Sequence, residues 1–238
     1  MAANLFLISA LTAQNDQKTL AIGIHFNPNR LTKTPVRFLD NIEDSNGGIS
    51  QMEEGGIFGY SIGANLIRYW NDKIGIEAGI YYSQRGYTWK YTRVSYTDSV
   101  FMRVNHEINP ITDEITHLYH CIDFPVSLRY KFLNSEKIDL YIRGGLIPYL
   151  VFKEENYEKF HYIIGGYKEY YHTDTEMKYF TTNANISALV ALGETFWLAE
   201  KLSLQLEVLS NYNILGMSIG SFDRLLNFGI SAGIVYEF

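Results

Sequence analysis

The feature that most constrains the fold is an alternation of apolar and polar residues, which recurs from Thr19 to the end of the chain. In the segment 58–66, apolar residues take every second position, and glycine, serine and asparagine lie between them. Successive side chains of a β-strand point to opposite faces, so a period of two predicts strands with one apolar and one polar face. The pattern returns in the segments 19–27, 74–85, 120–132, 138–152, 183–194, 201–213 and 224–238, which predicts about eight strands.

The connections between these segments differ in length. Tight polar turns are expected near 71–72, 134–136 and 199–200, and long excursions near 28–54, 89–116 and 154–181, with a shorter one near 214–223. Short turns at one end and long loops at the other are typical of an up-and-down meander. No change of composition marks a linker, so we expect a single domain over residues 14–238.

The polar face of the predicted strands indicates what surrounds them. It is rich in glycine and serine and carries only isolated charges, whereas the apolar face is continuous and ends in aromatic residues. Small residues suit a narrow barrel interior, and an apolar outer face with aromatic ends suits lipid. A closed barrel also leaves no backbone amide unpaired in the membrane. We therefore predict an all-β fold, a single up-and-down antiparallel transmembrane β-barrel of about eight strands.

Charged residues on the polar face are expected to form a network that fills the interior. Both signs occur among them, and charges enclosed in a narrow space must pair because an isolated buried ion is costly. We place Arg129 and Arg143 at the centre, with Asp123 and Asp139 as their neighbours. The predicted network comprises Glu77, Arg85, Asp123, Arg129, Asp139, Arg143, Glu207 and Glu237.

The pattern G-x-S-x-G, which marks the nucleophile of many serine hydrolases, occurs three times, at 59–63, 216–220 and 229–233. A nucleophile elbow needs a strained turn between a strand and a helix, and it occurs once in a catalytic domain. The first and third copies lie inside alternating strands, with glycine and serine on the polar face. We interpret them as small residues that line a narrow interior, and predict that the protein is not an enzyme.

The N-terminal segment differs from the rest of the chain. Leu5 to Gln14 reads LFLISALTAQ, a short apolar run followed by small residues, as in a secretory signal peptide. We expect residues 1–13 to be a signal peptide, although the preceding MAAN lacks the usual basic residues. The alternative is a first strand that frays.

Composition excludes several other classes of function. A formal net charge of −6 opposes a nucleic-acid partner, which needs a basic surface. The single cysteine, Cys121, rules out an internal disulfide and any site with several cysteine ligands. Of the six histidines, His161 and His172 lie in one long loop near Glu158 and Glu169, which suggests a weak surface metal site as an alternative. We predict no cofactor and no metal.

The C-terminal strand has an apolar face that runs to the last residue and includes Ile234, Tyr236 and Phe238. Such strands resemble the signal that the barrel-assembly machinery recognises in outer-membrane barrels. In mid-chain, GYSIGANL, IEAGIYYSQRGY, CIDFPVSLRYKF and YIRGGLIPYLVFK resemble elements of the PorT-like outer-membrane β-barrel family of Bacteroidota. The segment 122–130 matches that family's most recognisable strand, with Asp123 for glutamate and Arg129 for lysine. The resemblance implies an outer-membrane location, contact with lipid and a link to protein secretion.

The third long excursion is crowded with aromatic residues, which supply the rigid amphipathic area of binding surfaces. We expect a partner-binding loop formed by Tyr157, Phe160, Tyr162, Tyr167, Tyr170 and Tyr171. The same segment also fits a hairpin that extends the strands, with a turn at Gly165-Gly166. The predicted function is a non-enzymatic outer-membrane barrel with a filled interior, whose loops bind or scaffold envelope or secretion proteins. The alternatives are a membrane-embedded hydrolase and a soluble, lipocalin-like ligand-binding barrel.

Overall fold

The computed structural model describes residues 20–34, 39–43, 49–94, 110–135, 137–162, 168–175, 184–214 and 224–238. Segments outside these ranges include the expected signal peptide, the second G-x-S-x-G and the Gly165-Gly166 turn. Twelve strands join into one sheet of antiparallel pairs. They are β1 (Leu20–Thr34), β2 (Leu39–Glu43), β3 (Ile49–Gly56), β4 (Phe58–Tyr69), β5 (Ile74–Val94), β6 (Pro110–Asp123), β7 (Val126–Asn134), β8 (Ile138–Tyr162), β9 (Lys168–Thr175), β10 (Ala184–Ala199), β11 (Leu202–Asn213) and β12 (Arg224–Glu237).

The sheet closes on itself because β1 pairs with both β4 and β12. In three places, two consecutive strands together occupy one position in the wall. These are β3 and β4, which both pair with β5; β6 and β7, which both pair with β5 and β8; and β9 and β10, which both pair with β8. Counted around the wall, the barrel therefore has eight antiparallel strands. The predicted fold class is confirmed.

The break between β6 and β7 has a local cause. Pro125 has no N–H group to offer to the ladder, so regular pairing stops there. Neighbouring groups still hold the strand in place, since Phe124 N donates to Pro148 O at 2.8 Å and Gly79 N donates to Pro125 O at 3.0 Å. The two strands continue one wall of the barrel.

Apolar side chains cover the outside of the barrel, and polar ones fill it. Ile24 and Val208 are 65% and 64% exposed, whereas Arg129 and Asp139 are fully buried. A lipocalin-like barrel would show the reverse order, so the soluble alternative does not fit. Among the described residues, no helix is both long and apolar enough to cross a membrane.

Aromatic side chains gather at both ends of the apolar outer surface. At the end that carries the long connections, called the loop end below, the rings of Phe26, Tyr60, Tyr82 and Phe152 form a chain with centroid distances of 6.3, 5.9 and 6.2 Å. At the opposite end, called the turn end, exposed aromatic residues include Trp70, Tyr130, Tyr236 and Phe238. Such girdles mark the two interfaces of a membrane barrel.

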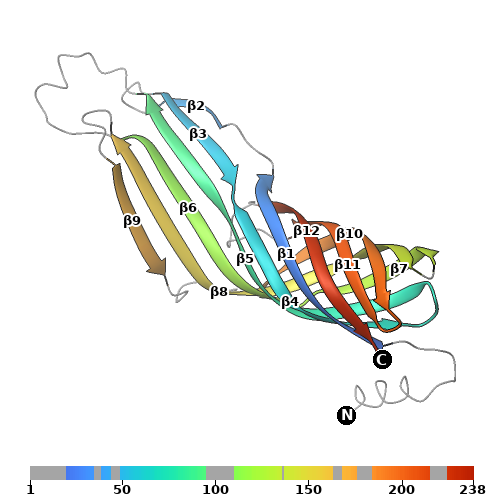
Figure 1. The fold of residues 1–238 in the computed structure, drawn as a ribbon. Helices are drawn as coiled ribbons and strands as arrows, with labels where there is room; N and C mark the ends of the chain where they lie inside the picture. Colours follow the sequence, from blue (N-terminus) through green and yellow to red (C-terminus); the bar gives the residue numbers. More distant parts are fainter. Residues whose placement is uncertain are drawn as a thin grey trace, which may run out of the picture.

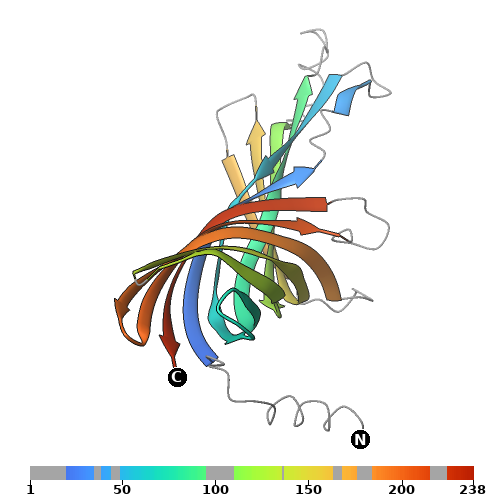
Figure 2. The same cartoon turned by 90° about the vertical axis from the view of Figure 1, so that its right-hand side faces the viewer.

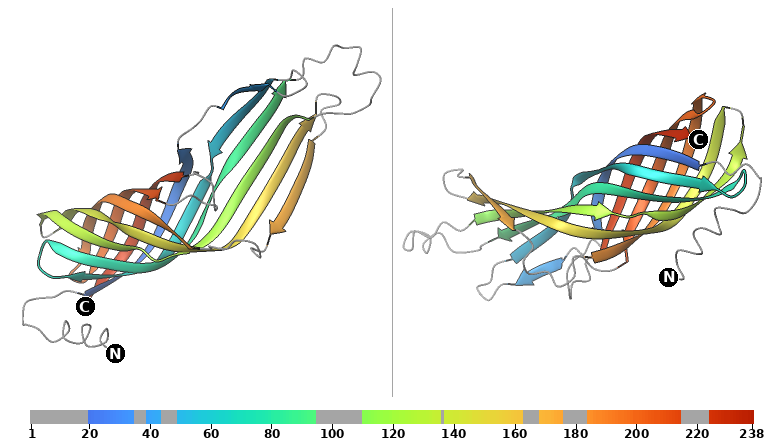
Figure 3. Two further views of the ribbon diagram at one scale, coloured as in Figure 1. Left: turned by 180° about the vertical axis from the view of Figure 1, so that it is seen from behind. Right: turned by 90° about the horizontal axis from the view of Figure 1, so that it is seen from below.

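Beyond the loop end, the strands continue on one side of the barrel only. Figure 1 shows β5, β6 and β8 running past the closed part, flanked by β2 and β3 on one edge and by β9 on the other. Figures 2 and 3 show the same open wall from other sides, while β10 to β12 stop lower. We call this wall the extension; it comprises β2, β3, β9 and residues 87–94, 110–120 and 153–162.

The extension corrects the prediction of long loops at 28–54 and 89–116, and at 154–181 it agrees with the predicted hairpin that extends the strands. Much of each segment is strand, because β1 reaches Thr34, β5 reaches Val94 and β8 reaches Tyr162. The aromatic segment pairs as a hairpin, with His161 opposite Lys168 and Glu154 opposite Thr175. Ladder pairing satisfies the backbone of residues that, as loops, would have needed water or side-chain partners.

Candidate functional site

All eight charged residues of the predicted network face the interior of the barrel or its turn-end mouth. Seven of them are buried, and Glu237 is partly exposed at the turn end. The charges form three tiers along the barrel axis, each with both signs. The residues, from the turn end upward, are Lys131 and Asp139; Arg129, Arg143, Glu77 and Glu207; and Arg85 and Asp123.

The central tier holds two arginines between two glutamates. Arg129 Nη2 lies 2.6 Å from Glu77 Oε2 and 3.5 Å from Glu207 Oε1. Arg143 donates to both acids, with its Nη2 2.6 Å from Glu207 Oε2 and its Nη1 on Glu77 Oε1. Each charge therefore faces two opposite charges, as a buried ion requires.

Neutral side chains complete this central tier. Asn65 Nδ2 donates to Glu77 at 2.6 Å, and Tyr141 OH donates to Glu207 at 2.8 Å. The Arg129 guanidinium also lies over the Tyr141 ring, 3.9 Å from its centroid. Gly193 makes room for that ring, because a Cβ atom there would lie 2.6 Å from Tyr141 Cε2. The tier blocks the middle of the barrel.

The prediction that Asp123 and Asp139 are neighbours of the two arginines was wrong. Asp123 lies six residues from Arg129 along the β6–β7 wall, and Asp139 lies four residues from Arg143 in β8, about 20 and 13 Å away. Asp123 instead pairs with Arg85, and Asp139 pairs with Lys131 Nζ at 2.9 Å. Glu77 comes from β5, which pairs with β7, whereas Glu207 comes from β11, which β10 separates from β8. Only the register of the sheet reveals these partners.

Lys131 was not among the predicted members, although it shares the polar face of Arg129. Its ammonium group lies 4.3 Å from the centroid of the Tyr69 ring, and Trp197 Nε1 donates to Asp139 Oδ2 at 3.3 Å. The alternation of β7 could have identified it, since residues 127, 129 and 131 all point inward. Lys131 supplies the fourth cation of the interior.

Two cavities flank the central tier. A small one of about 40 Å³ lies on the loop side, lined by residues that include Tyr81, Asp123 and Arg143. A larger one of about 500 Å³ opens at the turn end. The first has room for about one or two water molecules.

The G-x-S-x-G segments at 59–63 and 229–233 lie within β4 and β12, with no strand-to-helix turn. Ser231 Oγ lies 3.3 Å from His25 Nδ1, and both side chains are buried between strands. A Cβ atom at Gly233 would lie 2.6 Å from His25 Cγ, so this glycine leaves space for the ring. The pattern reflects close packing inside the barrel.

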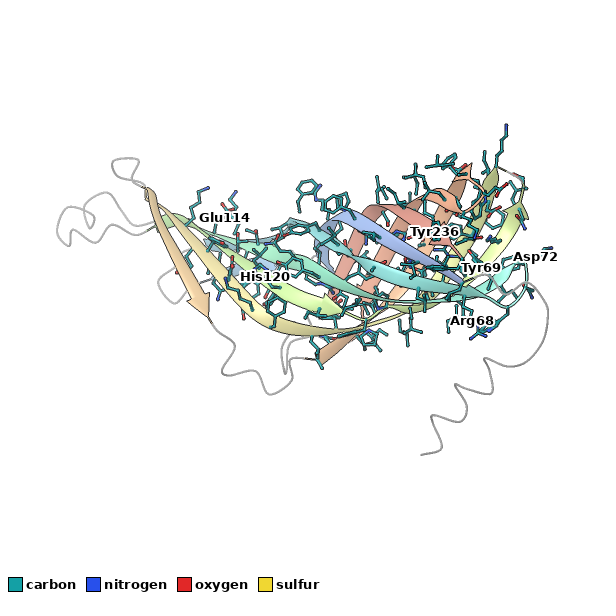
Figure 4. The ribbon with its side chains drawn as sticks, turned by 60° about the horizontal axis from the view of Figure 1, so that its bottom comes forward. Arg68, Tyr69, Asp72, Glu114, His120 and Tyr236 are labelled. Atoms are coloured by element: carbon teal, nitrogen blue, oxygen red, sulfur yellow. The ribbon has the colours of Figure 1, made fainter. Side chains whose placement is uncertain are left out.

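The extension carries its own polar groups (Figure 4). On the outer face, His120 Nε2 lies 3.2 Å from Glu155 Oε1, and His120 Nδ1 lies 2.6 Å from Tyr82 OH. Lys153 and Tyr157 donate to Glu155 at 2.6 and 2.7 Å, and these hydrogen bonds lower the pKa of Glu155 to about 2. On the inner face, His117 Nδ1 lies 3.2 Å from Glu154 Oε1, among the rings of Tyr87, Trp89 and Tyr119.

Of the six residues predicted to form a partner-binding loop, Tyr157 is exposed on the outer face of β8. Phe160 and Tyr162 belong to β8 and Tyr170 and Tyr171 to β9, whereas Tyr167 lies outside the described residues. The register places His161 opposite Lys168 and His172 opposite Tyr157, so the two histidines of the suggested metal site are not paired. In the described part of the chain, no group of three or more histidine, cysteine or acidic residues could hold a metal ion.

The side chains of Ile234, Tyr236 and Phe238, the predicted assembly signal, point outward from the last strand. Tyr236 and Phe238 form a T-shaped contact with ring centroids 5.3 Å apart. Phe238 N donates to Leu20 O at 2.9 Å, which ties the end of the last strand to the start of the first. These residues belong to the girdle at the turn end, where Figure 4 labels Tyr236.

Several solved structures are similar to this chain at low sequence identity. Neisserial surface protein A is 12% identical, with a TM-score of 0.47, over 92% of this chain and 97% of that one. OmpT, the outer membrane protease of Escherichia coli, is 11% identical, with a TM-score of 0.42, over 95% of this chain and 99% of that one. OprG of Pseudomonas aeruginosa is 10% identical, with a TM-score of 0.41, over 93% of this chain and 96% of that one.

A search of curated proteins found no match. The family model described as "outer membrane protein beta-barrel domain" matches residues 12–206, most of the chain. The match agrees with the closed barrel, its apolar outer surface and its two aromatic girdles, and it confirms the predicted location. This chain is a member of the outer membrane protein β-barrel domain family and a protein of the bacterial outer membrane.

Proposed function

We propose that the protein is a non-enzymatic barrel with a filled interior, whose extension binds or scaffolds a partner outside the membrane. The observation that carries this proposal is the extension itself, which continues the strands well past the aromatic girdle of the loop end. Membrane crossing does not need these extra residues, since strands of about 9–11 residues span a bilayer. A sheet that rises on one side of the mouth offers a face and an edge to a partner.

The filled interior supports a non-enzymatic role. The serine and histidine that come together, Ser231 and His25, are 1% and 3% exposed, so a substrate cannot reach them. The paired charges of the central tier lie between the two ends of the barrel, and their side chains are buried. The binding surface is then expected on the extension, where Tyr157 is exposed beside Glu155.

The finer assignments follow the sequence patterns. The strand at 122–130 supports membership of the PorT-like group of Bacteroidota, and with it a link to protein secretion. The outward side chains of Ile234, Tyr236 and Phe238 support recognition by the barrel-assembly machinery. Residues 1–13 would be removed as a signal peptide, which leaves a barrel domain at 14–238. The turn end would face the periplasm and the extension the outside, as in other outer-membrane barrels.

Site-specific photocrosslinking in native outer membranes tests the proposal. A photoreactive phenylalanine analogue replaces Tyr157 in one variant and Trp70, exposed at the turn end, in the matched control. We expect a discrete protein adduct from position 157 that is missing from position 70, identified by mass spectrometry. An absence of adducts at 157, or the same adduct from both positions, would contradict a partner on the extension.

A further inference from the structure

The cavity at the turn end plays no part in the function proposed above. It has a volume of about 500 Å³, within the range of small-molecule and peptide sites. Its walls come from three turns of the barrel, which contribute Asp72, Ser135 and Glu200, and from the last strand, which contributes Glu237. Lys131 and Asp139, the lowest tier of the interior charges, also line it. We call this cavity the turn-end vestibule.

The charges that line the vestibule are unbalanced. Among the described residues, four carboxylates line it, those of Asp72, Asp139, Glu200 and Glu237, against one ammonium group, that of Lys131. Lys131 is already engaged, because it pairs with Asp139 at 2.9 Å and lies over the Tyr69 ring. Three negative charges therefore remain in the lining. Exposed lysines 73, 137 and 201 lie on the same turns but are not among the lining residues.

Asp139 gives a second, independent reason to expect a cationic guest. It is fully buried, and its Oδ1 atom has no hydrogen-bond partner in the described part of the chain, although Lys131 and Trp197 both engage Oδ2. A carboxylate oxygen without a partner leaves negative potential beneath the vestibule, and burial strengthens that potential. The Trp197 ring adds an aromatic wall of the kind that attracts cations.

We propose that the turn-end vestibule binds the ammonium or guanidinium groups of a basic peptide segment that reaches the barrel from the turn side. The lining already holds one ammonium group, that of Lys131, between a carboxylate and an aromatic ring. A lysine or arginine side chain from outside finds the same two kinds of partner in Glu237, Glu200 and Trp197. The charge of such side chains is opposite to the excess charge of the lining.

Fluorescence anisotropy with the full chain in a non-ionic detergent tests this proposal. The probes are labelled tetralysine and tetraglutamate amides, and the main variant is Glu200→Gln with Glu237→Gln, at two positions that are not fully buried. We expect tetralysine to bind, tetraglutamate not to bind, and the double variant to bind tetralysine about fivefold more weakly. Asp139→Asn should weaken binding as well. The matched control, Glu158→Gln in the extension, removes one negative charge at the other end and should leave the affinity unchanged.

Several outcomes would overturn the proposal. They are no binding of tetralysine, equal binding by the wild type and the double variant, or an equal loss in the Glu158→Gln control, which would indicate attraction to net charge alone. Complete displacement of tetralysine by millimolar Mg²⁺ but not by N-acetyl-lysine amide would indicate an inorganic cation site instead. The Tyr157 crosslink does not depend on any of these results, so the two proposals fail separately.

Discussion

The closed barrel and the extension are built from the same strands, yet their two faces carry different chemistry. Within the barrel, β8 turns Arg143 inward and Ile142 outward. Farther along the same strand, in the extension, Lys153 and Glu155 form an ion pair on the outer face. The backbone is the same in both regions. What differs is the surroundings of the outer face, lipid along the barrel and water along the extension.

The comparison also separates two kinds of ion pair. The Arg143 side chain is 7% exposed and meets two glutamates, whereas the Lys153 side chain is 40% exposed and meets Glu155. Removing one partner of a buried pair leaves an uncompensated charge, while an exposed charge is solvated by water. Charge pairing should therefore hold the barrel together and contribute little to the extension.

The largest effect is expected from Arg143→Leu. Loss of this guanidinium leaves Glu77 and Glu207 with Arg129 as their remaining cation, and both carboxylates are buried. The free energy of unfolding should fall by about 3–5 kcal/mol. Urea titration of the protein refolded into detergent or lipid vesicles measures this change, with tryptophan fluorescence as the signal.

The matched control for Arg143→Leu is Lys153→Leu, the same kind of change in the same strand. In this control the free energy of unfolding should fall by about 1 kcal/mol or less. If both variants lose similar stability, the distinction between the two regions is wrong.

A medium effect is expected from Gly193→Ala, which tests close packing inside the barrel. The new methyl group would overlap the Tyr141 ring and displace it from Arg129 and Glu207. Overpacking of this kind costs about 1–3 kcal/mol. Gly144→Ala on the lipid side is the control, because its Cβ atom would meet nothing nearer than Leu189 O at 3.8 Å. Urea titrations should show a lower free energy of unfolding for Gly193→Ala alone. Equal losses of stability in the two variants would count against a packing role for Gly193.

The barrel itself could be predicted from sequence because one physical pattern governs it. Lipid outside and a narrow interior impose a period of two, and Ile24, Phe26 and Ile62 on one face, with His25 on the other, follow it strictly. The same pattern identified every inward charge of the predicted network. The turns at 71–72, 134–136 and 199–200 were also evident, since each interrupts the alternation with polar residues.

The charge partners and the extension could not be predicted in the same way. A pair such as Arg143 and Glu207 depends on the register of β8, β10 and β11, which are joined through turns and pairings far apart in the chain. The segments 28–54 and 89–116 were expected as loops, whereas 154–181 was also predicted as a hairpin that extends the strands. Where both faces meet water, sequence periodicity weakens even though the backbone is still paired.

The last prediction concerns ion conductance, where the smallest effect is expected. If paired charges fill the barrel, the wild-type protein in a planar bilayer should show no steady conductance, because an eight-stranded barrel is just wide enough for its own side chains. The internal cavity of about 40 Å³ beside Arg143 is too small to form a channel. Recordings need proof of insertion, such as protease protection of reconstituted vesicles, and a porin recorded in parallel as the positive control. A stable, large conductance from the wild type would mean that the central tier does not close the barrel, and the contrast between a filled barrel and an open extension would then fail.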